Sequence, residues 1–516
     1  MDLDELRDEV HRVLTDPTLS FHQRRHHLAV LAEHSQAHPE LPEDVAEAFN
    51  KRIICDLYEG NAPYRPRYLL PDYRIAFAQG SPFVEMDAPT TLEEALDFLT
   101  VLYGHVPSIT GYPVYLGDLD LLLEPFVGDL TDDELDHHLR RFLLLSDRLL
   151  PDAFVHANLG PSDSRVARSV LRVDRELEQV VPNLTLRVDP ELTPDELILE
   201  GVHTVFATAK PHFVNHPLMV RDLGEDYGVV SCYNSLPVGG GSHTLSRLDL
   251  RQVALLHNGS LEEFFDSTLP RAAEWLAQLM EARIRYLVEE VRWFEHDFLA
   301  TEGIVSLDRM TAMFGIVGLA EAVHELMSRD GREGTYGHDD EANALAHRIV
   351  HALHEFVEAR PMPYCEGTGG RALLHSQAGL DTDTSTTVGS RLPIGTEPGL
   401  FDHICAVAPN HDCFASGVSD IFHVEDTVIE NPEAMVDIIR GAFVEGMRDF
   451  TFNVGSNDFI RITGYLVRKS DLEGFAERGA RHGSTTFGYG AETNTGVTGR
   501  SVKRVVSREL GARAPQ

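Results

Sequence analysis

The chain has 516 residues and a formal net charge of −38, with 43% hydrophobic and 24% charged residues. This composition is that of a globular protein, and the length suits several domains or one large α/β barrel. A chain this acidic should repel the phosphates of nucleic acids and anionic membranes, so we expect neither as a partner. Only four of the 44 basic residues are Lys, and no basic patch with interleaved aromatic residues is present.

The cysteines and the N-terminus indicate the compartment. The first residues, Met1-Asp2-Leu3-Asp4-Glu5, are acidic where a secretory signal needs positive charge. No run of apolar residues is long enough to span a membrane. The five cysteines are odd in number and scattered, which favours reduced thiols over a disulfide framework. The sequence therefore predicts a cytoplasmic protein whose cysteines are reduced. They are Cys55, Cys232, Cys365, Cys405 and Cys413.

The N-terminal part of the chain has helical patterning. Leu3, Leu6, Val10 and Val13 recur at helical spacing, and a Pro-rich stretch at 61–66 interrupts the pattern. Another helix is expected to begin after Thr91, which is suited to cap it. We expect an N-terminal helical region over residues 1–90.

A strand–helix–strand rhythm follows. Leu184–Val188 alternates like a strand, and Thr193 with Pro194 begins a helix that runs to Thr208. Tyr227–Cys232 is a short apolar run bounded by turn-forming residues, typical of a buried strand. This order favours a parallel sheet.

Cys232 stands between that strand and a loop. Residues 233–242 include three consecutive glycines and are expected to form the loop, after which Leu245–Leu250 alternates again. A cysteine at such a junction is placed to enter a cavity. From position alone, a small buried hydrophobic residue is the more common role of a reduced cysteine.

The second half of the chain alternates between helices and loops. Helices are expected over 261–297, 339–360 and 433–448, and loops over 365–397. A long structureless stretch inside a compact domain is often functional. The run 449–454 has strand character and leads toward the segment Arg461-Ile462-Thr463-Gly464-Tyr465.

Two groups of histidines could bind metal. His22, His26 and His27 share a helix, but no carboxylate or cysteine pattern completes a site, so a solvated helix face is expected. A second cluster could bind metal or polarise a substrate, although its spacing matches no zinc template. One hypothesis is therefore a metal-dependent hydrolase that uses His403, His411, Asp412 and His423.

Three separated segments resemble glycyl radical enzymes. The run Arg461–Tyr465 resembles the signature of that class, and the segments 228–250 and 313–322 resemble parts of anaerobic (class III) ribonucleotide reductases. Over most of its length, the chain is most similar to the YjjI family of glycyl radical enzymes. Glycine suits a backbone radical because it has no side chain to crowd a planar Cα.

The resemblance implies two site residues and a fold. Gly464 would store the radical, and Cys232 would form the thiyl that abstracts hydrogen from a small organic substrate; Cys365, beside Glu366, and Cys413 are alternatives for the thiol. The fold would be α/β: a ten-stranded barrel surrounded by helices. Residues 91–440 would form the barrel with the Cys loop, and residues 441–516 the C-terminal glycyl radical region.

The resemblance also implies the partners and the cofactor. The cofactor would be the oxygen-sensitive radical on Gly464, with no bound cofactor and no metal. A separate radical S-adenosylmethionine activating enzyme would install it, because the chain has no CxxxCxxC motif. A homodimer is left open.

The reaction stays open as dehydration, C–C cleavage or C–X cleavage of a sugar, nucleoside or polyol. The reductases carry a four-Cys zinc site before the radical glycine, whereas this chain has no cysteine after Cys413, so ribonucleotide reduction is not expected. A non-catalytic barrel-shaped binding protein is the other alternative.

Overall fold

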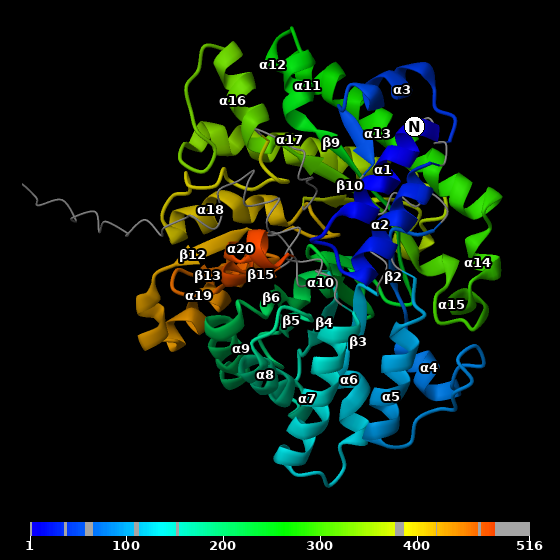
Figure 1. The fold of residues 1–516 in the computed structure, drawn as a ribbon. Helices are drawn as coiled ribbons and strands as arrows, with labels where there is room; N and C mark the ends of the chain where they lie inside the picture. The colour runs from blue at the N-terminus through cyan, green and yellow to red at the C-terminus, as the bar shows by residue number, and fades with distance from the viewer. Residues whose placement is uncertain are drawn as a thin grey trace, which may run out of the picture.

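The computed structural model describes residues 3–35, 39–56, 65–107, 113–150, 154–376, 386–418, 420–462 and 466–479. Their strands form a six-stranded sheet, a five-stranded sheet and two hairpins. Helices surround the sheets on the outside (Figure 1). One large hydrophobic core cluster contains residues from Val45 to Leu472, and a second, small cluster joins β6, α10 and the hairpin at 227–233.

The six-stranded sheet has the order β12-β13-β6-β5-β4-β3. The strands β3 to β6 are parallel, β12 is parallel to β13, and β13 runs antiparallel to β6. Helices follow β3, β4, β5 and β6, which confirms the parallel rhythm predicted around residues 184–208. The strands are β3 (Tyr115–Asp118), β4 (His156–Leu159), β5 (Asn183–Val188), β6 (His212–Asn215), β12 (Ile421–Val424) and β13 (Asp449–Val454).

The five-stranded sheet is built around β9 (Gly240–Asp249) and β10 (Met310–Val317). β10 is parallel to β9 and to β11 (Leu373–His375), a strand inside the segment predicted to be loops. Two short strands from the N-terminal region, β1 (Ile54–Asp56) and β2 (Tyr68–Leu70), run antiparallel to β9. Residues 1–90 are therefore not purely helical, since they also contribute strands to this sheet.

The glycine triplet was expected in a loop, but Gly240 and Gly241 begin β9. A Cβ atom at Gly240 would lie 2.0 Å from the carbonyl oxygen of Arg309, and one at Gly241 would lie 2.1 Å from that of Tyr68. Neighbouring backbones approach so closely there that only glycine fits. The loop prediction is thus wrong for residues 234–237 and 240–242, which form strands, and it holds for the turn at 238 and 239. At Gly240 and Gly241, close packing accounts for glycine.

The helices lie outside the two sheets. α7, α8 and α9 pack side by side along the six-stranded sheet, and α11, α13, α16 and α17 lie with the five-stranded sheet (Figure 1). Their bounds, with those of the other helices, are α1 (Leu3–Thr15), α2 (Phe21–His34), α3 (Glu43–Asn50), α4 (Tyr73–Gln79), α5 (Leu92–Tyr103), α6 (Leu119–Leu123), α7 (Asp132–Leu149), α8 (Arg165–Leu177), α9 (Asp195–Thr208), α10 (His216–Leu223), α11 (Leu250–Leu256), α12 (Leu261–Glu263), α13 (Leu269–Arg285), α14 (Trp293–His296), α15 (Phe298–Thr301), α16 (Leu319–Arg329), α17 (Asp340–Ala359), α18 (Leu400–His411), α19 (Glu433–Val444), α20 (Lys469–Glu473) and α21 (Phe475–Arg478).

The fold class is α/β, as predicted. Within the six-stranded sheet β13 pairs with β6, and β2 of the five-stranded sheet lies beside β3 of the six-stranded sheet. Among the described strands, hydrogen-bonded pairing does not run as one closed ring, so closure of a ten-stranded barrel stays a prediction. The predicted domain boundary at 440/441 falls within α19.

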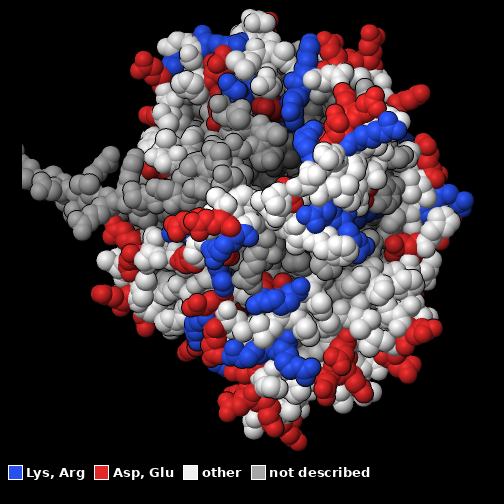
Figure 2. Space-filling view, viewed as in Figure 1, with Lys and Arg blue, Asp and Glu red and all other residues white. Residues whose placement is uncertain are grey.

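The surface reflects the acidic composition. Figure 2 shows acidic side chains over much of one face, with Lys and Arg side chains between them. No described helix combines the length and the apolar character that crossing a membrane requires.

Candidate active site

Cys232 lies at the tip of a buried β-hairpin between the two sheets. β7 (Tyr227–Val230) pairs antiparallel with β8 (Asn234–Pro237), and every residue of both strands is buried. β7 lies against β3 and β4 of the six-stranded sheet, and β8 lies against β9 and β10 of the five-stranded sheet. Cys232 thus enters the interior between the sheets. The strand predicted over 227–232 belongs to this hairpin and not to the parallel sheet.

The turn that carries the thiol has a strained backbone. Ser231 and Tyr233, on either side of Cys232, have φ angles of 52° and 61°, in the left-handed region. That region costs an L-residue about 1–2 kcal/mol. Such conformations persist only where the surrounding structure enforces them, and they concentrate at functional sites. Cys232 is half-buried and packs against the hydrophobic core.

Three separate elements hold the residue next to Cys232. The ring of Tyr233 meets that of His212 edge to face, with centroids 4.5 Å apart, and the Arg461 guanidinium lies 5.7 Å from its centroid. A Cβ atom on Gly417 would lie 2.0 Å from the carbonyl oxygen of Tyr233, so the loop after α18 packs directly on the turn. Burial raises the pKa of Tyr233, which keeps its phenol neutral.

A buried polar cluster lies beside this tip, on neighbouring strands β4, β5 and β6. The Nε2 atom of His156 lies 2.7 Å from Oγ1 of Thr185, which in turn lies 3.2 Å from Nε2 of His212. All three side chains are fully buried. Burial lowers the pKa of both histidines well below the usual value, so both imidazoles are neutral. No pattern in the sequence predicted this cluster.

Gly464 itself lies outside the described residues. Its neighbours in sequence form a second hairpin, in which β14 (Phe459–Arg461) pairs antiparallel with β15 (Leu466–Arg468). The register places Arg461 opposite Leu466. The described flanks of Gly464 are therefore fixed in the fold.

Arg461 holds the start of this hairpin in the interior. The side chain is buried, and its Nη2 donates to Oδ1 of Asn183 at 3.1 Å and to the carbonyl oxygen of Ala209 at 2.8 Å. Its backbone amide and carbonyl both bond to the amide side chain of Asn453, at 2.9 Å each. The same guanidinium lies over Tyr233. Arg461 therefore connects the segment of residues 461–465, called the RITGY segment below, with the turn of Cys232.

Arg391 makes a second connection between the two segments. Its Nη1 donates to the carbonyl oxygen of Ile462 at 3.2 Å. Burial lowers the pKa of Arg391, and interactions with Tyr233, Asp420 and Cys232 oppose that effect. The structure therefore brings the predicted thiol and the flanks of the predicted radical glycine together, although they are far apart in sequence.

The alternative thiols have different surroundings. Cys365 is buried at the start of the 3-10 turn η5 (Glu366–Thr368), which packs on β10, and burial together with Glu366 raises the pKa of its thiol. Cys413 follows α18, where burial first and Asp412 second raise its pKa to about 11. Cys232 alone of the three lies at the turn held by Tyr233.

The predicted hydrolase cluster is not assembled. The side chain of Asp412 is 67% exposed and forms an ion pair with Arg221, at 2.7 Å. His411 uses both ring nitrogens, because Nδ1 accepts from the backbone amide of Arg448 at 3.0 Å and Nε2 donates to Oδ2 of Asp420 at 3.0 Å. Among the described residues, no group of three or more His, Cys, Asp or Glu is placed to hold a metal ion.

Asp420, which no sequence pattern indicated, lies between the two histidines of this region. Its Oδ1 lies 3.6 Å from Nε2 of His403, and its other oxygen accepts from His411. Burial favours the neutral acid, but the two histidines outweigh it and hold the pKa of Asp420 below its usual value. Asp420 is thus a buried carboxylate close to Arg391.

A pocket joins this carboxylate to the RITGY segment. It encloses about 360 Å³ of empty space, part of it open to solvent. Polar and charged side chains from four separate segments contribute to its wall. The lining residues are Arg391, Leu392, Ile394, Glu397, His403, Asp420, Ile421, His423, Arg461 and Ile462.

Comparison with known proteins decides the class. The family described as "Glycyl radical enzyme YjjI-like" matches residues 19–503. The chain belongs to this family. The uncharacterized protein YjjI of Escherichia coli (strain K12) is 45% identical over 512 residues, which cover 99% of this chain and 98% of that protein. The chain is thus a glycyl radical enzyme, and the two alternatives, hydrolase and non-catalytic binding protein, are not supported.

Solved structures show the same fold at low sequence identity. Hydroxyproline dehydratase (HypD) from Clostridioides difficile has a TM-score of 0.66 at 12% identity, over 89% of this chain and 86% of that one. The anaerobic ribonucleotide reductase from Thermotoga maritima has a TM-score of 0.67 at 14% identity, over 92% of both chains. Glycyl radical enzymes carry their radical on a backbone glycine, installed after translation by a radical S-adenosylmethionine activase.

Proposed function

We propose that Gly464 stores the radical and that Cys232 receives it to form the thiyl. The observation that carries this assignment is the pair of arginines between the two segments. Arg391 donates to the carbonyl of Ile462 and interacts with Cys232, and Arg461 lies over Tyr233. In the transfer, the S–H bond of Cys232 breaks and a Cα–H bond forms on Gly464. The thiyl then takes a hydrogen atom from substrate.

The proposed substrate is a small, polar organic molecule of the sugar, nucleoside or polyol type. The neutral histidines His156 and His212, together with Thr185, offer hydrogen-bonding groups in a dry interior beside Cys232. Such an interior also protects a radical from solvent. Solved relatives of this fold hold trans-4-hydroxy-L-proline and glycerol, which are small hydroxylated molecules. The reaction is therefore proposed as dehydration, C–C cleavage or C–X cleavage.

The enzyme is proposed to act in the cytoplasm. A separate activase would install its radical, and the proposed assembly is a homodimer. The division into residues 1–90, 91–440 and 441–516 is proposed as a functional one. The last region contains the glycyl segment and also gives β13 to the six-stranded sheet. The radical segment is thereby anchored to the same sheet that supports the hairpin of Cys232.

Anaerobic activation tests the assignment without a known substrate. The protein is mixed with its activase, S-adenosylmethionine and a reductant, and an EPR spectrum is recorded. We expect a doublet from the one remaining α-hydrogen, lost in Gly464→Ala and retained in Cys232→Ser.

In D₂O the doublet should collapse to a narrower line. Each round trip of the spin takes a solvent-exchanged deuterium from the thiol of Cys232 to the glycine. Cys232→Ser should block that collapse, and Cys365→Ser and Cys413→Ser should not. Collapse in Cys232→Ser at the wild-type rate would overturn the assignment of the thiol.

A further inference from the structure

Among the described residues, β7 is hydrogen-bonded as a strand to β8 alone, so its other edge is buried against β3 and β4 without strand pairing. In an antiparallel pair, residues alternate between bonding to the partner strand and pointing their backbone groups away from it. The amide and carbonyl of Val229, and the carbonyl of Tyr227, bond to side chains instead of to β8. Buried backbone groups need partners, so these side chains complete the strand.

Asn158 at the end of β4 provides two of these bonds. Its Oδ1 accepts from the backbone amide of Val229 at 2.8 Å, and its Nδ2 donates to the carbonyl oxygen of Val229 at 2.7 Å. The side chain is fully buried. A carboxamide offers a donor and an acceptor side by side, so it replaces the missing strand at this residue.

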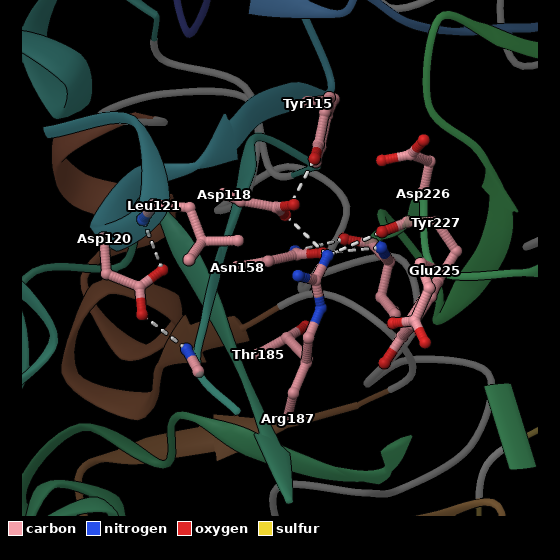
Figure 3. Close-up of polar contacts among 12 residues, drawn as sticks. Tyr115, Asp118, Asp120, Leu121, Asn158, Thr185, Arg187, Glu225, Asp226 and Tyr227 are labelled. Atoms are coloured by element: carbon pink, nitrogen blue, oxygen red, sulfur yellow. Dashed lines mark hydrogen bonds and ion pairs between the residues drawn. The ribbon is translucent and has the colours of Figure 1, made fainter. Parts of the chain in front are cut away.

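Arg187 on β5 provides the third bond. Its Nη2 donates to the carbonyl oxygen of Tyr227 at 2.6 Å and to Oδ1 of Asp118 at 2.6 Å. The guanidinium also lies 4.6 Å from the centroid of the Tyr227 ring. Asp118 is fixed in turn by the hydroxyl of Tyr115, at 2.8 Å. Figure 3 shows these side chains converging on β7 from the neighbouring strands.

The depth of β7 is fixed at the same place. A Cβ atom on Gly228 would lie 2.8 Å from the ring of Tyr115 and 2.9 Å from Leu70. Glycine therefore lets the strand lie directly on these side chains. The ring sets how close β7 comes to β3, and the bonds to Asn158 and Arg187 set its position along the sheet.

We propose that Asn158 and Arg187 are positioning residues that set the place of the Cys232 thiol relative to Gly464. The proposal rests on the function proposed above. Cys232 lies only three residues beyond Val229, so a shift of β7 along its axis moves the thiol with it. A slip of two residues would displace the turn by roughly 7 Å, and even a displacement of about 1 Å can slow a reaction about a hundredfold.

The deuterium exchange of the glycyl radical measures this position directly. The activase acts on Gly464, whereas exchange needs transfer of a hydrogen atom between Gly464 and Cys232. A displaced thiol should therefore leave the radical yield unchanged and slow the collapse of the EPR doublet in D₂O. A purely structural role for Asn158 would lower stability and leave that rate unchanged.

Asn158→Leu and Arg187→Met are the main variants. Leu is close in size to Asn but leaves both backbone groups of Val229 without a partner, so exchange should slow by about tenfold to a hundredfold. Asn158→Asp keeps an acceptor for the amide, and Arg187→Lys keeps a charged donor, so both should give intermediate rates. The matched control is Gln179→Leu, which removes a buried amide that donates to the carbonyls of Leu143 and Val181 at 2.8 and 2.7 Å, away from the hairpin.

The outcomes separate this proposal from the one it rests on. Slow exchange with wild-type radical yield in Asn158→Leu, and normal exchange in Gln179→Leu, supports the positioning role. Wild-type exchange in Asn158→Leu, or equal slowing in Gln179→Leu, overturns it. If Asn158→Leu does not fold, Asn158→Asp decides by the same comparison. A wild-type protein without a radical, or rapid exchange in Cys232→Ser, rejects the proposed function instead.

Discussion

A methyl group added at Gly417 should displace the turn that carries Cys232. Gly417 has a φ of 124°, a conformation that L side chains rarely adopt, and a Cβ atom there would lie 2.0 Å from the carbonyl oxygen and 2.9 Å from the carbonyl carbon of Tyr233. Real Cβ atoms essentially never come closer than 3.0 Å, so the backbone must move by about 1 Å to accept Ala. The group that must move belongs to the residue next to Cys232.

The expected loss in the free energy of unfolding of Gly417→Ala has two parts. The backbone conformation at Gly417 costs an L-residue about 1–3 kcal/mol, and overpacking against a fixed backbone costs a further ~1–3 kcal/mol. Gly446 isolates the first part, because its φ is 100° and the nearest atom to an added Cβ, the carbonyl oxygen of Ala408, is 4.0 Å away. Gly417→Ala should therefore lower the free energy of unfolding by about 1–3 kcal/mol more than Gly446→Ala.

Two assays separate stability from geometry. Denaturant unfolding gives the difference in stability, and EPR in D₂O gives the exchange rate of the glycyl radical. Gly417→Ala should slow exchange by up to about a hundredfold, because it displaces the thiol, whereas Gly446→Ala should exchange as the wild type does. Equal stability and equal exchange in the two variants would refute the close packing of Gly417 on the turn of Cys232.

Three further predictions concern buried charges. Lys210→Met should lower the free energy of unfolding by about 3–5 kcal/mol in denaturant titration. Nζ of Lys210 lies 2.7 Å from Oδ1 of Asp174, and both side chains are fully buried, so the variant leaves a buried carboxylate without its ion pair. Adding Asp174→Asn should recover most of the loss. Burial raises the pKa of Asp120 to about 7 from its ordinary 3.8, so the folded protein holds this proton more tightly than the unfolded chain. Stability should therefore fall as the pH rises from about 4 to about 7, and Asp120→Asn should flatten that dependence when thermal midpoints are compared between about pH 5 and pH 8; an unchanged slope would contradict the assignment. Arg461→Lys loses the paired bonds to Asn183 and the backbone, so EPR spin counting should find less glycyl radical than in the wild type, and full radical content would argue against its anchoring role.

The sequence predicted the elements whose signals are local. The strand over 449–454, the helix over 339–360 and the helix ending at Thr208 all appear where their patterns place them, the last two within a residue. Thr193 was expected at the start of that last helix, but its hydroxyl accepts from the backbone amide of Asp189 at 2.9 Å and donates to the carbonyl of Pro161 at 2.6 Å, and the helix begins after Pro194. Local capping was overridden there by a contact between two loops.

The strands that were missed depend on distant partners. β1 has three residues and β11 has three, too few for a period to be visible, and each exists because it pairs with β9 or β10. β8 was missed for another reason: its partner β7 is adjacent in the chain, but β8 follows Cys232 inside a segment rich in turn-forming residues. Its pairing with β7 supplies the order that composition did not indicate.

Cys232 and Gly464 were proposed through a resemblance, whereas Asn158 and Arg187, which we propose to position them, were not singled out from the sequence. Asn158 and Arg187 stand in strands whose residues are all buried, where a polar side chain gives no pattern of its own. Their proposed role follows from the hairpin between the sheets, because in the described chain the outer edge of β7 pairs with no strand and its backbone groups must bond to side chains. An inner hairpin that carries a reactive group has one strand edge facing the surrounding sheet. Polar side chains of that sheet must then bond to the backbone groups of this edge. In a related chain, we therefore expect the counterpart of Asn158 to offer both a donor and an acceptor, and an apolar residue there to require a different contact to the backbone of β7.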